Sequence, residues 1–200
     1  MPAPKQPSAA VPAAQAPKQR ATRKNARTPI LEAAVTLVAT SGVDALTFDR
    51  LAEATGISKG GILYHFRSKH DLLISLVAES VVRFEELWNH FAKRDDVVPG
   101  RQARAFLNAY VSVTRKSVAT NLNFAILAAT AADPTVMAPY FDAYERWQVR
   151  LADDGIDEET ATILRLVSDG LWATDLFRLP RLDDRLLDAI VERLRVMSSP

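Results

Sequence analysis

Cysteine is absent from this 200-residue sequence, which excludes disulfide scaffolds, thiolate zinc sites and cysteine nucleophiles. Uninterrupted runs of 18 apolar residues are also missing, so an ordinary membrane-spanning helix is excluded. The amino terminus has no Leu- and Val-rich run of the kind that a secretory signal contains. We therefore expect a cytoplasmic protein that does not act at a membrane.

Charge of one sign does not dominate the chain as a whole, but the charges are unevenly distributed. The net charge of +1 combines an excess of five positive charges over residues 1–75 with an excess of four negative charges over residues 76–200. This distribution suggests that the amino-terminal end meets a polyanion and that the remainder does not.

Proline is concentrated at the start of the chain, where five of 11 fall within the first 17 residues. Residues 1–25 are therefore predicted to be a disordered arm that is basic and rich in Pro and Ala. Two interpretations of this arm remain open. It is either a solvated tail or a segment that lies along nucleic acid, as the arms of some DNA-binding domains do.

Strand-like alternation of apolar and polar residues is missing, and from Thr28 onward apolar residues recur at helical spacing. Capping residues and Gly or Pro positions mark the boundaries. We predict an all-α fold of about nine helices, over residues 28–41, 47–54, 58–65, 69–91, 101–119, 122–131, 135–153, 157–178 and 182–197.

The segment LTFDRLAEATGISKGGILYHFRSKHDLL, residues 46–73, predicts two short helices joined by a tight turn. Gly56 can adopt the positive φ that a three-residue turn requires, and Ala52 lets the two helices cross closely. This is the pattern of a helix-turn-helix, whose second helix enters the major groove of DNA. The wedge between the helices is predicted to hold Leu51, Ile57 and Ile62.

Residues 28–75 resemble the DNA-binding domain of the TetR/AcrR family of transcriptional regulators. The resemblance implies a three-helix head, residues 26–72, and an effector-binding and dimerisation domain over residues 73–200. It also implies a one-component repressor that a small apolar or amphipathic effector releases from a palindromic operator. The matching elements are the helix before Gly42, then Thr47, Leu51-Ala52, Gly56-Ile57-Ser58-Lys59-Gly60, Tyr64-His65-Phe66 and Lys69.

The matched positions supply eight candidate DNA-binding residues. Lysines suit phosphate contacts, hydroxyls at helix N-termini suit phosphate or capping, and glycines let a helix approach the groove. The aromatic pair is a candidate for groove contacts, with packing against the next helix as the alternative. The eight are Thr47, Ser58, Lys59, Gly60, Gly61, Tyr64, His65 and Lys69.

The sequence departs from the usual family pattern near the end of this helix. Leu63 lies where many family members have Tyr, and Tyr64 follows one position later. One residue rotates a helical side chain by about 100°. Tyr64 is therefore expected to contact a different phosphate, or a base edge.

The carboxy-terminal part of the chain carries many aromatic residues. They fit either an ordinary helical core or, by the family resemblance, the wall of an effector cavity. The candidate pocket residues are Trp88, Phe91, Phe106, Tyr110, Phe124, Leu127, Trp147 and Trp172.

The last two predicted helices each carry an apolar stripe, as the helices of a dimeric four-helix bundle do. A homodimer of this kind would read an inverted repeat in double-stranded DNA. The candidate interface residues are Val167, Leu171, Thr174, Leu187, Ile190 and Leu194.

Catalytic and cofactor motifs are not found, so we expect no enzyme activity, no cofactor and no metal site. Glu86 and His90 have metal-binding spacing, but no third ligand is evident. Phosphate-binding loops, nucleophile elbows and dinucleotide fingerprints are missing. Two alternatives remain: a DNA-binding regulator controlled by a partner protein, and a helical interaction module that does not bind DNA.

Overall fold

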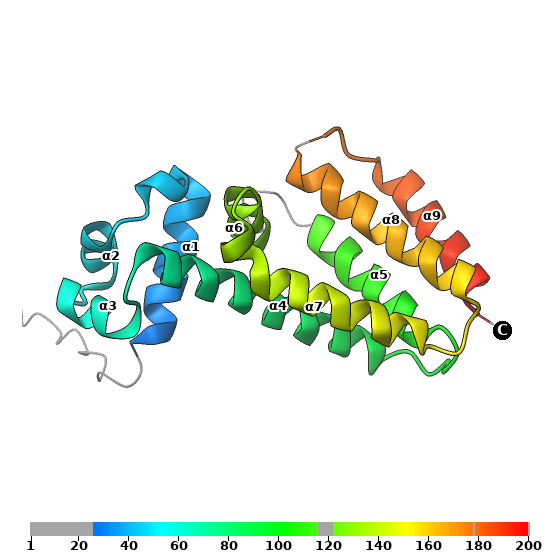
Figure 1. The fold of residues 1–200 in the computed structure, drawn as a ribbon. Helices are drawn as coiled ribbons and strands as arrows, with labels where there is room; N and C mark the ends of the chain where they lie inside the picture. The colour runs from blue at the N-terminus through cyan, green and yellow to red at the C-terminus, as the bar shows by residue number, and fades with distance from the viewer. Residues whose placement is uncertain (1–25, 116–121, 178, 200) are drawn as a thin grey trace, which may run out of the picture.

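The computed structural model describes residues 26–115, 122–177 and 179–199, except for the side chains of residues 122–125. Within these ranges the chain forms nine α-helices and one 3-10 helix, without a strand (Figure 1), so the predicted all-α class is confirmed. The predicted arm, residues 1–25, lies outside the described residues.

The helix boundaries agree with the predictions to within a few residues. The predicted helix over residues 101–119 ends earlier, at Thr114 with Arg115 as its C-cap residue, and residues 116–121 lie outside the described ranges. A short 3-10 turn after the first helix was not predicted. The elements are α1 (Arg27–Ser41), η2 (Val43–Ala45), α2 (Phe48–Thr55), α3 (Lys59–His65), α4 (Lys69–Ala92), α5 (Arg101–Thr114), α6 (Leu122–Thr130), α7 (Pro134–Ala152), α8 (Glu158–Leu176) and α9 (Asp184–Met197).

Local capping explains where the short helices of the head begin. The Thr47 hydroxyl accepts a hydrogen bond from the Arg50 backbone N–H at 3.3 Å, and the Ser58 hydroxyl accepts one from the Gly61 N–H at 3.2 Å. Each cap satisfies a backbone donor that has no partner within its own helix. The starts of α2 and α3 are thus fixed by residues that the sequence alone identifies.

The core of the head has the predicted wedge between α2 and α3. Gly56 lies in the left-handed region with φ 70° and ψ 8°, and its N–H donates to the Ala52 carbonyl. Leu51 and Ile62 are completely buried, and Phe66 is buried at the end of α3. The tight turn and the buried wedge confirm the helix-turn-helix geometry predicted from the sequence.

Helix α4 connects the head to the rest of the molecule (Figure 1). Its amino-terminal turns pack against α1, and its later turns pack against α5 and α7. Helices α8 and α9 both pack against α5. Helix α6 packs against both α1 and α4, so it lies between the head and the bundle formed by α4, α5, α7, α8 and α9.

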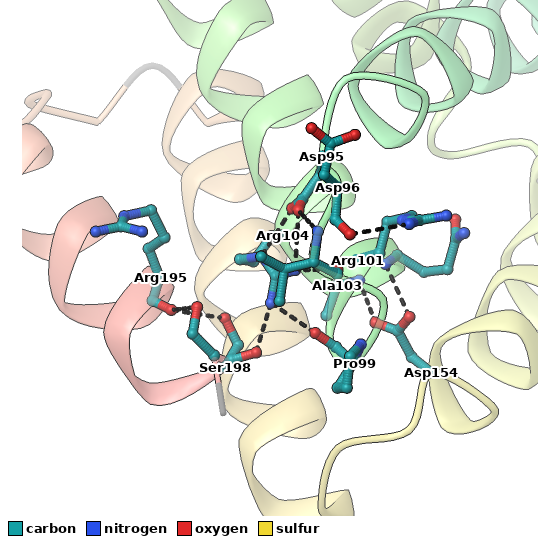
Figure 2. A network of polar contacts seen from close by, with 12 residues as sticks. Asp95, Asp96, Pro99, Arg101, Ala103, Arg104, Asp154, Arg195 and Ser198 are labelled. Atoms are coloured by element: carbon teal, nitrogen blue, oxygen red, sulfur yellow. Dashed lines mark hydrogen bonds and ion pairs between the residues drawn. The ribbon is translucent and has the colours of Figure 1, made fainter.

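A buried arginine ties several segments together at the end of the bundle away from the head (Figure 2). The Arg104 side chain forms an ion pair with Asp95 at 2.8 Å and donates to the backbone carbonyls of Val97, Pro99 and Ser198. Nearby, the Asp154 carboxylate accepts from two backbone N–H groups at the start of α5 (Figure 2). Burial raises the pKa of Asp154 above its ordinary value, although these hydrogen bonds oppose the shift. The network joins the loop before α5 to the ends of α7 and α9.

Candidate nucleic-acid interface and ligand pocket

The eight predicted DNA-binding residues all lie in the head, on or beside α2, α3 and the start of α4. Five are exposed, while Gly61, His65 and Lys69 are half-buried. Tyr64 is the most accessible large side chain among them, with 79% of its surface exposed. The exposed five are Thr47, Ser58, Lys59, Gly60 and Tyr64.

The two glycines at the start of α3 have different surroundings. A Cβ atom added at Gly60 would meet nothing within 4 Å, whereas one at Gly61 would lie 2.9 Å from the Ile57 Cγ2 atom. Gly61 is therefore needed for the close packing of the turn against α3. Folding does not require glycine at position 60, which leaves the surface at this point free of a side chain.

The predicted phosphate-binding Lys59 forms an exposed ion pair that the sequence analysis missed. Its Nζ lies 3.0 Å from an Asp49 carboxylate oxygen, and both side chains are more than half exposed. The pair joins the first turn of α2 to the first turn of α3, ten residues apart in the chain. Only the helix-turn-helix geometry could have indicated this neighbour, because helical spacing rules connect residues three or four apart.

The aromatic end of α3 faces partly outward. Tyr64 and His65 form an edge-to-face pair with ring centroids 5.2 Å apart. Leu63, at the position where the family usually has Tyr, is also exposed. The structure therefore places Tyr64 free to reach a ligand, while His65 contacts both neighbouring rings.

A polar contact links the head to the start of α7. The His70 Nε2 and Thr135 Oγ1 atoms lie 2.8 Å apart, and the Thr135 hydroxyl donates to Asp133 at 2.6 Å. Hydrogen bonds from the Thr135 hydroxyl and the Val136 N–H lower the pKa of Asp133, and the nearby His70 adds to this effect. Together with α6, this contact connects the position of the head to that of the bundle.

Most of the aromatic residues proposed for the ligand pocket pack ring against ring. Trp88, Phe106, Tyr110 and Trp147 are buried, and the Trp88 and Phe106 ring centroids lie 4.9 Å apart. Burial raises the pKa of Tyr110 well above its ordinary value, so this hydroxyl stays neutral. These four residues form a packed core among α4, α5 and α7.

The remaining pocket candidates are spread around this core. Leu127 is buried on α6, and Phe91 is half-buried near the end of α4. Trp172 is half-buried and stacks on Tyr140, with ring planes 15° apart. Burial also raises the pKa of Tyr140 to about 12. The Phe124 side chain lies outside the described residues.

A pocket with a volume of about 350 Å³ lies elsewhere, between the end of α5, the outer part of α8 and the start of α9. None of the seven described pocket candidates lines it. Four of the predicted interface residues do, namely Val167, Leu171, Thr174 and Leu187. The sequence did not predict this pocket, because its position depends on how three helices pack against one another.

Exposed apolar side chains also lie along α8, α9 and the connection between them. Leu171, Leu187 and Leu194 are buried within the protomer, and Val167, Thr174 and Ile190 are half-buried. The exposed apolar residues nearby form a surface that we call the outer face. The outer face consists of Ile163, Leu166, Phe177, Leu182 and Leu186.

Among the described residues, no group of three or more His, Asp or Glu side chains is placed to hold a metal ion. No helix in those ranges is both long and apolar enough to cross a membrane.

Comparison with known sequences identifies two regions of the chain. Residues 30–76 match the family model described as bacterial regulatory proteins of the tetR family, and residues 101–199 match the tetracyclin repressor-like C-terminal domain. The transcriptional repressor AcnR of Corynebacterium glutamicum is 41% identical over 63 residues, 32% of this chain and 34% of that protein. KstR2 of Rhodococcus jostii is 34% identical over 93 residues, 46% of this chain and 43% of that repressor. The sequence matches thus span a third to less than half of these relatives.

Solved structures show the same fold over most of the chain. The multidrug-binding protein EbrR, in complex with imidazole, aligns with a TM-score of 0.65 and 19% identity, covering 90% of this chain and 97% of EbrR. The region matched to the amino-terminal family model contains the helix-turn-helix built by α2 and α3. The two family models and the shared fold agree: the chain belongs to the TetR family of transcriptional regulators.

Proposed function

We propose that the protein is a homodimeric transcriptional repressor that binds an inverted-repeat operator and leaves it when a small effector binds. The observation that carries this proposal is the exposed surface of α3, the second helix of the helix-turn-helix, with Lys59 and Gly60 at its start and Tyr64 near its end. In such motifs the second helix enters the major groove and its first residues reach the base edges.

The proposed contacts divide into positioning and sequence recognition. Lys59, Lys69 and the N-terminal groups of α2 and α3 contact phosphates, which fix the protein on the duplex without reading its sequence. Tyr64 is proposed to contact a base edge or the groove wall, because its side chain is free of the protein core. Gly60 lets the α3 backbone approach the DNA.

The outer face supports the proposed dimer. Ile163 and Leu166 lie on α8, and Phe177 is the C-cap residue of this helix. Their three- and eleven-residue intervals place them on one side of α8. Clustered exposed apolar residues on a soluble protein mark an interaction surface. Pairing this face with its symmetry copy would form a four-helix bundle from two α8–α9 pairs.

Ligand binding by a protein of the same fold supports the proposed effector. EbrR has been solved with ethidium and malachite green as well as with imidazole. A change in the separation of the two heads would lower operator affinity, since both recognition helices must fit one face of the DNA. DNA must then weaken effector binding by the same factor.

Selection of binding sites from random duplex DNA tests this function. Purified protein at near-physiological salt should enrich an inverted repeat, since dimeric readout imposes two-fold symmetry on the site. The same selection with a Lys59→Ala and Tyr64→Ala double variant is the control and should lose enrichment. Recovery of no motif by the folded wild-type protein would contradict the proposal.

A further inference from the structure

The pocket between α5, α8 and α9 combines hydrogen-bond donors with an apolar wall. We infer that this pocket binds an amphipathic carboxylate, which acts as the effector of the proposed repressor. The inference rests on the proposed function for the effector role, whereas the binding chemistry follows from the pocket itself. Its volume of about 350 Å³ lies at the lower end of the range for small-molecule sites.

A buried hydroxyl without a partner points to a polar ligand group. Thr114 lines the pocket and is only 6% exposed, yet its Oγ1 has no hydrogen-bond partner in the described part of the chain. A buried hydroxyl in this state costs free energy, so native proteins usually satisfy such groups. The Oγ1 atom is closed to solvent in this conformation, so a ligand oxygen would supply the missing partner once the Thr114 side chain rotates toward the pocket.

Two arginines beside Thr114 indicate the charge of that ligand group. Arg115 lines the pocket and forms an exposed ion pair with Asp188, through one of its nitrogens. A ligand carboxylate can replace this exposed partner, because surface ion pairs contribute little to stability. A guanidinium binds a carboxylate well, since its planar N–H donors match the two oxygens.

The second arginine is held in place by a buried acid. The Arg181 Nε and Nη2 atoms both contact the same Asp175 oxygen, at 2.7 and 2.6 Å, and the Asp175 side chain is 1% exposed. This ion pair fixes the Arg181 guanidinium group at the pocket lining. The acidic lining residue, Asp184, is exposed in the first turn of α9, where solvent and the helix N-terminus balance its charge.

The rest of the lining accommodates an apolar tail. Val167, Leu171, Leu182 and Leu187 contribute aliphatic side chains from α8, α9 and the connection between them. Burying such a tail against aliphatic carbon is favourable in proportion to the apolar area covered. The pocket thus matches a molecule with a carboxylate at the α5 end and a hydrocarbon body along α8 and α9.

The position of the pocket connects it to both the dimer and the head. Leu182 belongs to the pocket lining and to the outer face, so a bound ligand lies at the edge of the proposed dimer interface. Helix α8, which supplies four lining residues, packs against α6, and α6 packs against α1 and α4. A ligand that contacts α8 can therefore influence the element between the bundle and the head.

Three probes with the same alkyl chain test the charge preference. Binding of octanoate, octanol and octylamine to the full-length protein is measured by isothermal titration calorimetry. Octanoate should bind about tenfold more tightly than octanol, since its head group makes charge-assisted hydrogen bonds. Equal or tighter binding of octylamine, or no binding of octanoate, would overturn the inference.

Two variants that break the same ion pair separate a binding role from a structural one. Arg115→Gln removes the guanidinium and should weaken octanoate binding about tenfold. Asp188→Asn frees the guanidinium and should tighten it about threefold. Arg185→Gln removes a positive charge from α9 outside the pocket and is the matched control. An equal loss of octanoate affinity in Arg115→Gln and Asp188→Asn would show that the ion pair supports the structure of the pocket and that the guanidinium does not bind the ligand. That result would overturn the assignment of Arg115.

Thr114→Val tests the buried hydroxyl without leaving a cavity. The variant should weaken octanoate binding about tenfold while raising the melting temperature, because it removes an unsatisfied polar group. Unchanged octanoate affinity would overturn the role of Thr114.

Operator release distinguishes failure of this inference from failure of the proposed function. If the protein without octanoate does not bind DNA, the proposed function fails whatever octanoate does. If it binds its selected operator and octanoate binds without weakening that complex, the effector role of the pocket is overturned. If octanoate releases the wild-type protein from its operator but does not release Arg115→Gln, the result supports both the proposed function and the effector role of the pocket.

Discussion

Glycine occupies two consecutive positions at the start of α3, but the protein needs it there for different reasons. Gly61 lies against Ile57, whereas Gly60 has open space around its Cα atom and helical backbone geometry. Alanine is favoured over glycine within a helix, since glycine loses more conformational entropy on folding. Glycine at position 60 therefore costs stability that the fold itself does not require, which fits a role in approaching DNA.

Gly60→Ala is expected to stabilise the protein and to weaken its binding to DNA. The free energy of unfolding should rise by about 0.5–1 kcal/mol, measured by urea denaturation. Operator affinity should fall, because the added methyl group separates α3 from the groove. Gly61→Ala is the comparison and should gain less stability, owing to its contact with Ile57. Unchanged DNA affinity in Gly60→Ala would remove this residue from the interface.

The Lys59–Asp49 ion pair predicts opposite effects of changing its two members. Lys59→Ala should weaken binding to all DNA sequences similarly and reduce the salt slope by about one unit, as loss of one phosphate contact does. Asp49→Asn should tighten binding about threefold, since it removes a competitor of the phosphate and a repelling charge. Affinity measured over a series of salt concentrations checks both. Weaker binding by Asp49→Asn would show that the pair positions Lys59.

Single residues could be predicted from the sequence where their role is local. The Thr47 and Ser58 caps and the positive φ of Gly56 depend on a few neighbouring residues, and the structure confirms them. The partner of Lys59 and the need for glycine at position 61 depend on how two helices meet across the turn. Spacing rules within one helix contain no such information.

The Arg104 side chain joins α5 to the loop that precedes it and to the end of α9 (Figure 2). Arg104→Met should lower the free energy of unfolding by about 3–5 kcal/mol, because it leaves a partly buried carboxylate and three carbonyls without their donor. Urea denaturation measures this loss. Arg195→Met, which breaks only the exposed ion pair with Glu192, is the control and should cost less than about 1 kcal/mol. An equal loss of unfolding free energy in the two variants would show that the Arg104 network does not hold these segments together.

The same network predicts a dependence of stability on pH. Burial raises the pKa of Asp95, but hydrogen bonds from Arg104 and from the Val97 N–H outweigh burial and bring the pKa below its ordinary value. Because the pKa of Asp95 is lower in the folded state than in the unfolded state, its ionised form stabilises the fold at any pH above the unfolded-state pKa. This stabilisation is lost as the pH falls through the folded-state pKa. Denaturation between pH 5 and pH 2 should therefore show a shallower decline in Arg104→Met than in the wild type. Parallel curves would contradict this role of Asp95.

At the level of helices, the sequence predicted number, order and approximate ends, because capping residues and prolines act locally. The sequence could not show which aromatic residues lie in a packed core and which line a cavity. Trp88 and Phe106 fit both interpretations by composition, and the structure places them in a packed core. The pocket is lined instead by residues proposed for the dimer interface, such as Val167 and Thr174. Which side of an amphipathic helix lies on a neighbour, a void or solvent depends on the packing of the whole bundle.

For the whole molecule, the proposed dimer depends on the outer face. Leu166→Glu places a charge at its centre and should convert the dimer into monomers, as measured by sedimentation equilibrium. Operator affinity should fall steeply, since a single head reads only one half-site. Val149→Glu, at an exposed position on α7 outside this face, is the control and should remain dimeric. A dimeric Leu166→Glu protein would place the interface elsewhere.

The central claim is that two heads, held by one dimer, read two half-sites on the same face of DNA. Its most direct test is the affinity of the protein for its selected inverted repeat before and after insertion of about five base pairs at the centre, roughly half a helical turn. The insertion keeps both half-sites intact but turns them to opposite faces of the duplex. Binding should fall to the level of a single half-site. Equal affinity for the two duplexes would contradict the proposed dimeric readout.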